Sequence, residues 1–101
     1  METFKTIKKK VIPAEYFIHI IGVVFNKKNS WIKKFQIIQK EYNLIEVKLV
    51  KNFDENRGDL KNLENGIKKV MDENCKVRFT FVDNIPPLKS GKFLYTICEV
   101  I

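Results

Sequence analysis

The segment with the clearest capacity for chemistry is the run IPPLKSGKF at residues 85–93. Its Gly-Lys pair also occurs in the P-loop, but Pro86 stands where the first glycine belongs and Phe93 replaces the magnesium-binding hydroxyl, which excludes that motif. What remains is Lys92 beside Gly91, on a loop entered through two prolines. A lysine held there can neutralise charge that develops on a phosphate or carboxylate. The alternative is an ordinary hairpin turn with a solvated lysine.

The other residue types that carry chemistry have simpler structural interpretations. His19 lies in an apolar segment and is expected to be a hydrogen-bonded core histidine rather than a catalyst. Trp31, next to Lys33-Lys34, can stack a base, but we expect it to anchor the start of a strand. Cys75 and Cys98 match no metal-ligand or C-x-x-C spacing, so we expect buried thiols in a reduced, cytoplasmic setting. A single histidine excludes a His-rich metal centre and argues against a Ser–His–Asp site.

Length and composition predict one folded domain that spans residues 1–101. The chain is 45% hydrophobic and has 12 aromatic residues, eight Phe, three Tyr and one Trp, which argues against disorder. No apolar run approaches the roughly 18 residues of a membrane span. The basic start lacks the apolar stretch and cleavage site of a secretory signal.

The net charge of +7 is unevenly distributed. Residues 1–51 hold 11 lysines and four acidic residues, whereas residues 52–101 hold eight charges of each sign. The excess is concentrated at Lys8–Lys10, Lys27–Lys28 and Lys33–Lys34. Such clusters can attract phosphate-bearing partners such as nucleic acid, nucleotides or coenzyme A. We favour the simpler interpretation of a solvated face, because arginine, the better reader of phosphate, is nearly absent.

The elements that must position these residues begin with a short hairpin and a helix. Phe4–Thr6 and Lys10–Ile12 are short enough to pair with each other. Pro13 suits the first turn of a helix that continues to Phe25. This helix is apolar nearly all round, so we expect it to be buried on most faces. A strand over Ile18–Phe25 is the alternative.

The rest of the chain alternates strands with one amphipathic helix. Trp31–Gln39 and Leu44–Val50 predict an antiparallel hairpin, whose second strand places Glu46 and Lys48 on a wet face. Asp59 is expected to cap a helix with Leu60, Leu63, Ile67, Val70 and Met71 on one face and Gly66 as a weak point. Val77, Phe79 and Phe81 alternate as a third strand, and Phe93–Val100 is extended. The predicted fold class is α+β, a small mainly antiparallel sheet with two helices packed on it plus a short hairpin.

Several motifs together resemble one enzyme superfamily. Pro86 followed by Ser90-Gly91-Lys92 is similar to the C-terminal lysine motif P-x-x-x-[SN]-G-K of the adenylate-forming, AMP-binding superfamily. The flanks VDNIP (82–86) and KF-x-Y-x-I (92–97), with FQIIQ (35–39) and IEVKLV (45–50), resemble the phenylacetate–CoA ligase and capsule-biosynthesis adenylyltransferase-like branch. Essentially the whole chain is similar to the small C-terminal domain of these enzymes. Tyr95 stands three positions after the lysine, where the family often has a basic residue. Pro87-Leu88 stand after Pro86, where the family commonly has Arg and Thr.

The resemblance implies an activity and a partner. Such enzymes use ATP, with magnesium, to convert a carboxylic acid into an acyl-adenylate, and many then pass the acyl group to CoA. Lys92 would be the catalytic cation, Ser90 and Gly91 its substrate loop, and Glu2 a remnant of the hinge near residues 1–3. ATP and CoA would be bound mainly by a large N-terminal adenylation domain that this sequence does not match, so the chain would be incomplete as a catalyst. Neither a membrane nor nucleic acid is an expected partner.

A second interpretation stays open beside this one. The chain could be a stand-alone basic α+β module that binds nucleic acid or an acidic protein through its lysine clusters. A degenerate remnant without activity is a third possibility. The ligase interpretation depends on Lys92, and the binding-module interpretation on Lys8–Lys10 and Lys33–Lys34.

Overall fold

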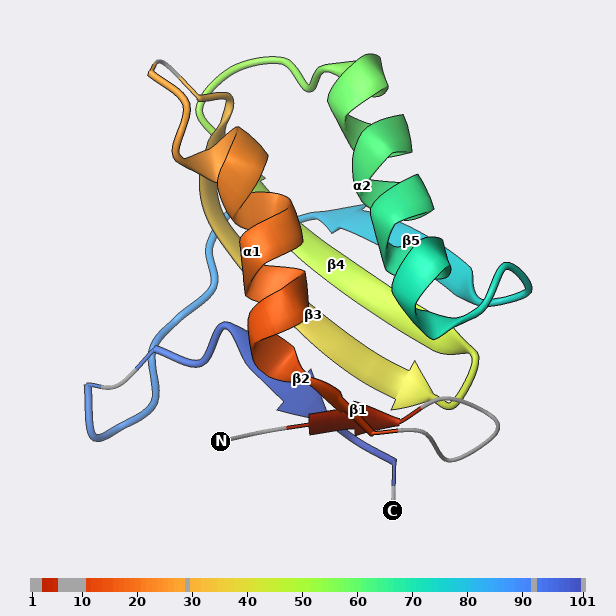
Figure 1. The fold of residues 1–101 in the computed structure, drawn as a ribbon. Helices are drawn as coiled ribbons and strands as arrows, with labels where there is room; N and C mark the ends of the chain where they lie inside the picture. Colours follow the sequence, from red (N-terminus) through yellow and green to blue (C-terminus); the bar gives the residue numbers. More distant parts are fainter. Residues whose placement is uncertain (1–2, 6–10, 29, 92, 101) are drawn as a thin grey trace.

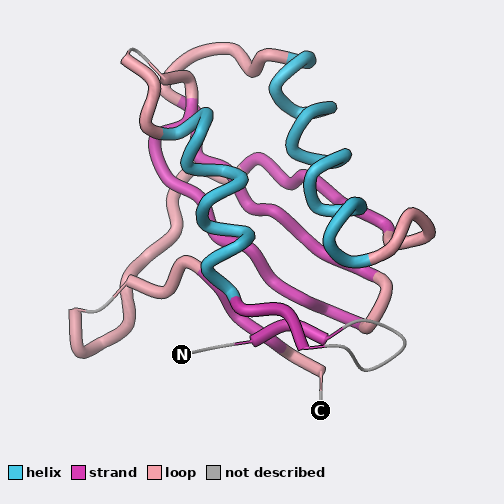
Figure 2. Tube along the Cα trace, in the orientation of Figure 1, coloured by secondary structure: helices cyan, strands magenta, loops and turns pink. Residues whose placement is uncertain are grey.

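The computed structural model describes residues 3–5, 11–28, 30–91 and 93–100. Its elements are β1 (Thr3–Lys5), β2 (Val11–Pro13), α1 (Ala14–Phe25), β3 (Ile32–Glu41), β4 (Leu44–Lys51), α2 (Arg57–Met71), β5 (Lys76–Phe81) and β6 (Thr96–Cys98). Strands β1 and β2 form a separate two-stranded sheet, and the other four form one sheet in the order β5-β4-β3-β6. Both helices lie on the same face of the larger sheet (Figure 1; helices cyan in Figure 2). The predicted α+β class is therefore confirmed.

The four-stranded sheet is mixed rather than mainly antiparallel. Only β3 and β4 are antiparallel, with Phe35 opposite Leu49 and Gln39 opposite Ile45. β5 is parallel to β4, and β6 is parallel to β3. The cause is the connections: α2 returns the chain to the end of the sheet where β4 begins, so β5 runs parallel to β4, and a long loop then passes from β5 to the opposite edge, where β6 runs antiparallel to β5 and hence parallel to β3. Parallel neighbours need crossovers of this length, whereas the β3–β4 hairpin needs only a tight turn.

Helix α1 buries one face and exposes the other. Phe17, Ile21 and Val24, spaced by four and three residues, are buried in the core. Tyr16 and Val23 on other sides of the helix are 55% and 60% exposed. The prediction of burial on most faces was wrong, because within the described residues the sheet and α2 cover only one side of this helix.

Helix α2 has the expected apolar face, with Leu63, Ile67 and Met71 buried. Its cap differs from the prediction: Asn56, not Asp59, is the N-cap, and the Asn56 side chain accepts a hydrogen bond from the Asp59 backbone N–H at 3.0 Å. The glycine within this helix has a packing reason. A Cβ on Gly66 would lie 3.1 Å from Ile20 of α1, so the small residue permits the close approach of the two helices.

The small hairpin closes one end of the core. β1 and β2 pair antiparallel with Phe4 opposite Ile12, as predicted, although the predicted strand ends Thr6 and Lys10 lie outside the described residues. Phe4 is fully buried, and its ring centroid lies 4.6 Å from that of Phe17. The hairpin therefore holds the start of α1 against the body of the domain.

The second face of the sheet is partly covered by the chain between β5 and β6. Alternate residues of a strand point to opposite faces, so Gln36 and Ile38 lie on the face away from the helices, yet both are buried. Gln36 donates a hydrogen bond to the Leu94 carbonyl at 2.9 Å, and Ile85 is buried as well. The loop over residues 82–95, which we call the crossing loop, is thus packed on the sheet at both ends.

Glu46 was expected to face water and does not. It is 7% exposed and accepts hydrogen bonds from Arg78 Nε at 3.2 Å and from Thr80 Oγ1 at 3.1 Å. The Arg78 guanidinium also forms a 3.0 Å ion pair with it. The parallel pairing of β4 and β5 puts Arg78 directly beside Glu46, which explains how the sheet accommodates a buried carboxylate.

Candidate functional site

The crossing loop projects its middle away from the sheet. Every residue from Pro86 to Gly91 is exposed. Ile85 anchors the loop at one end, where it is 4% exposed, and the Tyr95 carbonyl accepts a 2.8 Å hydrogen bond from the Ile37 N–H at the other. The projecting part is visible in Figure 1 as the blue loop at the lower left. The residues that sequence analysis singled out therefore occupy an exposed loop with two fixed ends.

A turn organises this exposed part. The Gly91 N–H donates to the Leu88 carbonyl at 2.8 Å, which closes a four-residue turn through Lys89 and Ser90. Gly91 has a φ of +86°, a conformation that residues with a Cβ rarely adopt. A Cβ at this position would meet nothing within 4 Å. Glycine is therefore required here by the backbone conformation and not by lack of space.

The structure does not place all of the predicted site residues. Lys92 and Glu2 lie outside the described residues, as do Lys8–Lys10. Ser90 and Gly91 lie together in the turn, and Lys89 is exposed.

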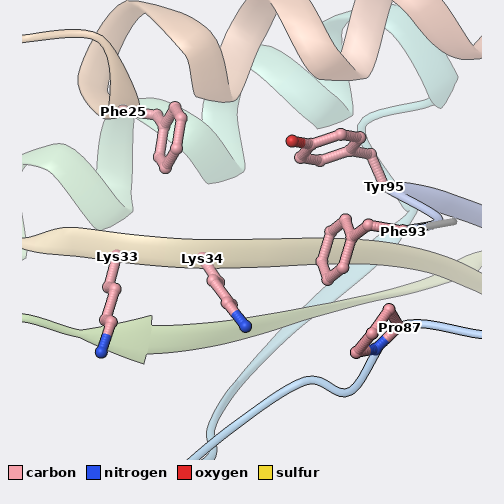
Figure 3. A pocket seen from close by; sticks show the side chains of 6 residues that line it. All are labelled: Phe25, Lys33, Lys34, Pro87, Phe93 and Tyr95. Atoms are coloured by element: carbon pink, nitrogen blue, oxygen red, sulfur yellow. The ribbon is translucent and has the colours of Figure 1, made fainter. Parts of the chain in front are cut away.

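Beside the crossing loop lies a pocket that sequence analysis missed. It has a volume of about 290 Å³ and is lined by Phe25, Lys33, Lys34, Pro87, Phe93 and Tyr95 (Figure 3). We call it the aromatic–lysine pocket. Its walls come from the end of α1, the start of β3 and the crossing loop. Because β6 pairs with β3 only at residues 37–39, the edge of β3 near Lys33 and Lys34 is not covered by that strand.

The aromatic rings of this region form a connected series. The ring centroids of Phe25 and Phe35 are 5.3 Å apart, those of Phe35 and Tyr95 are 5.0 Å apart, and those of Tyr95 and Phe93 are 4.7 Å apart. Lys34 Nζ lies 6.0 Å from the centroid of the Phe93 ring and 3.1 Å from Asn84 Oδ1. The series links α1 to the residues that directly follow Lys92. The adjacent lysines and the Phe93-x-Tyr95 alternation were the available signals, but nothing local joins residues about 60 positions apart.

His19 and Trp31 have opposite outcomes. His19 is exposed on α1, so the expectation of a core histidine was wrong. The cause is the single buried face of that helix. Trp31 is 4% exposed directly before β3, and its Nε1–H donates to Asp59 Oδ2 at 2.9 Å. The predicted role as an anchor is confirmed, and the bond joins β3 to the first turn of α2.

The two thiols are both free. Cys75 is buried between α2 and β5, as expected, and burial raises the pKa of its thiol. Cys98 in β6 is only partly buried, and its Sγ lies 3.5 Å from Gln39 Oε1. Within the described ranges, no three His, Cys, Asp or Glu side chains gather into a site for a metal ion. Neither helix in that part of the chain has the length and apolar character that a membrane span requires.

Comparison with known proteins identifies the family. No curated protein and no solved structure matches the chain. A family model described as the CapK C-terminal domain matches residues 4–99, a range that covers the elements described above except Thr3, the first residue of β1. CapK is an adenylate-forming enzyme similar to phenylacetate–CoA ligase, so the resemblance carried by the lysine motif and its flanks is confirmed. The chain belongs to the CapK C-terminal domain family and is the C-terminal domain of a CapK-like adenylate-forming ligase.

Proposed function

We propose that this domain acts as the mobile C-terminal domain of an ATP-dependent acyl-activating ligase and supplies Lys92 to the adenylation step. The observation that carries the proposal is the family match, which extends across the P-x-x-x-S-G-K motif. The exposed turn directly before Lys92 supports it, because a lysine that acts on a substrate held elsewhere must stand on a projecting segment.

The chemistry needs a cation at one point. Acyl-adenylate formation brings a carboxylate to the α-phosphate of ATP, and the two anions repel each other. A lysine between them lowers this repulsion and stabilises the charge that builds up in the transition state. In this proposal Lys92 is that cation. Gly91 sets the backbone direction before it, and Ser90 belongs to the turn that presents it.

The other components would be bound elsewhere. A large adenylation domain would hold most of ATP with its magnesium ion, the carboxylic acid and the CoA acceptor. The C-terminal domain closes over them. Domain rotation about a hinge near Glu2 would then withdraw Lys92 and admit the thiol acceptor for the second step. The domain is accordingly not catalytic alone.

The proposal is tested in the complete enzyme with Lys92→Ala. Loss of one charge-stabilising group of this kind lowers the turnover rate by roughly 100- to 1,000-fold. ATP–pyrophosphate exchange measures the adenylation step directly. Lys89→Ala removes an exposed lysine three residues away in the same loop and is expected to leave exchange within about twofold. Unchanged exchange in Lys92→Ala, with its thermal unfolding also unchanged, would refute the proposal.

A further inference from the structure

The aromatic–lysine pocket has the composition of a site for a phosphorylated aromatic ligand. Among the described residues, its lining contains two lysines and no carboxylate. Each of the three other pockets described for this chain includes at least one acidic residue among its walls. An anion therefore meets net positive charge in the aromatic–lysine pocket and an opposing carboxylate in the others.

Among the described residues, no carboxylate forms an ion pair with the two lysines of this pocket. The basic residues in the ion pairs of the described part of the chain are Lys27, Lys40, Lys51, Lys68 and Arg78. None of those ion pairs engages Lys33 or Lys34. Lys33 is exposed, and Lys34 contacts a neutral amide oxygen and an aromatic ring. Both ammonium groups can therefore bind an anion without breaking any ion pair of the described residues.

The aromatic walls suit a planar ring. Tyr95 is 43% exposed although its ring packs on Phe35 and Phe93. Figure 3 shows its hydroxyl directed toward Phe25 on one side of β3, and the Lys33 and Lys34 side chains extending from the start of β3 toward the opposite side, where Pro87 lies. Exposed aromatic surface of this kind stacks readily on a base, and a phenolic hydroxyl can donate or accept a hydrogen bond.

The size of the pocket limits the ligand. Its volume of about 290 Å³ is close to the roughly 300 Å³ lower end for small-molecule sites. That space suits one base with its sugar and phosphate and is too small for a large cofactor as a whole. A single aromatic acid would use the rings but would leave one of the two lysines without an anion.

We propose that the aromatic–lysine pocket is a nucleotide-binding site in which Tyr95 and Phe93 contact the base and Lys33 and Lys34 contact the phosphate. This site lies within the domain and is separate from the ATP site that the adenylation domain would supply. Since Phe93 directly follows Lys92 in the chain, a bound nucleotide holds the end of the crossing loop on that side.

Binding is tested on the 101-residue chain with ¹⁵N labels. AMP, adenosine 3′,5′-bisphosphate, adenosine and inorganic phosphate are titrated separately while the backbone amide resonances are followed. We expect saturable shifts with AMP centred on Lys33, Lys34, Phe93 and Tyr95, and at least tenfold weaker binding of adenosine and of phosphate. Equal affinity for AMP and the bisphosphate would indicate that one phosphate suffices. Tighter binding of the bisphosphate would indicate that both lysines contact phosphate. Either result supports the site.

Variants separate stacking from charge. Tyr95→Ala is expected to weaken AMP binding roughly 5- to 100-fold, and Tyr95→Phe, which keeps the ring, by less than about threefold. Lys33→Gln is expected to weaken it about two- to fivefold, as for an exposed charge contact. Lys69→Gln, an exposed lysine on α2, is the matched control and should have no effect.

Three outcomes would overturn the proposal: no saturable AMP binding, equal affinity for AMP and adenosine, or equal weakening by Lys69→Gln and Lys33→Gln. The assay measures binding with Lys92 intact and involves no adenylation. Its failure therefore leaves the proposed role of Lys92 untouched, and failure of the exchange assay leaves this site untouched.

Discussion

Gly91→Ala isolates the contribution of loop conformation to catalysis. The position has a φ of +86°, and an added Cβ would meet no atom within 4 Å. The penalty is therefore conformational only, roughly 1–2 kcal/mol for a residue with a Cβ in the left-handed region. That energy corresponds to a roughly 5- to 30-fold smaller population of the native turn. If the turn presents Lys92 to the reacting groups, adenylation slows by the same factor.

The assay pairs activity with stability. ATP–pyrophosphate exchange by the complete enzyme should fall roughly 5- to 30-fold in Gly91→Ala, and less in Gly91→Asn, because asparagine tolerates positive φ better than alanine. The urea unfolding free energy of the domain should change by less than about 0.5 kcal/mol, since an exposed loop can relax.

Gly22→Ala, a substitution within α1, is the control and should leave exchange unchanged. Unchanged exchange in Gly91→Ala would refute the reasoning. So would a loss of exchange matched by an equal loss of stability.

Three further predictions concern the fold that carries the loop. Trp31→Phe removes the donor to Asp59 and should lower the unfolding free energy in urea by roughly 1–3 kcal/mol. Arg78→Met leaves the buried Glu46 carboxylate without its ion pair and should also cost roughly 1–3 kcal/mol in the same assay. Burial raises the pKa of the Cys75 thiol, so the folded state favours its neutral form. The resulting contribution to the free energy of unfolding is complete below the ordinary thiol pKa of 9.0 and is lost as the pH rises above it. Cys75→Ala should therefore flatten the decline of stability with pH.

Each of these has a direct check. Trp31→Phe should cost less when Asp59 is already alanine, and an equal cost in both backgrounds would show that the hydrogen bond contributes nothing. Lys76→Met on the same strand should change stability by less than about 0.5 kcal/mol, and a loss equal to that of Arg78→Met would contradict the role of the ion pair. Identical pH profiles for Cys75→Ala and the unmodified chain would contradict the effect of thiol burial.

Local sequence patterns predicted the elements well. The alternation of apolar residues along β4 and the helical spacing of Leu63, Ile67 and Met71 are set by backbone geometry, so each is visible in a short window. The β3–β4 hairpin followed because its two strands are separated by a tight turn. Its register needs no information from the rest of the chain.

Features that depend on distant contacts were not predictable in this way. The parallel pairing of β5 with β4, and of β6 with β3, depends on which sheet edge each strand joins. No residue within those strands indicates this choice. The exposure of His19 follows from how many partners α1 has, which its own apolar sequence does not reveal. Asn56 and Asp59 are both good cap residues, and only the position of the first helical turn decides between them.

The candidate site was predictable in part. The motif that ends at Lys92 is contiguous, so the exposed loop over residues 86–91 was readable directly from the sequence, whereas the role of Lys92 stays a proposal. The aromatic–lysine pocket joins Phe25, Lys33 and Lys34 to Phe93 and Tyr95, which are brought near one another by the pairing of β6 with β3. Such a pocket is a property of topology and is invisible to spacing alone.

The most direct test of the account compares the two half-reactions of the complete enzyme in Lys92→Ala. Adenylation is measured as pyrophosphate release in a single turnover, and acyl transfer as consumption of acyl-adenylate supplied from outside. The account predicts a roughly 100- to 1,000-fold slower adenylation with acyl transfer within about threefold of the unmodified enzyme. Equal loss in both half-reactions, or adenylation at the normal rate, would contradict it.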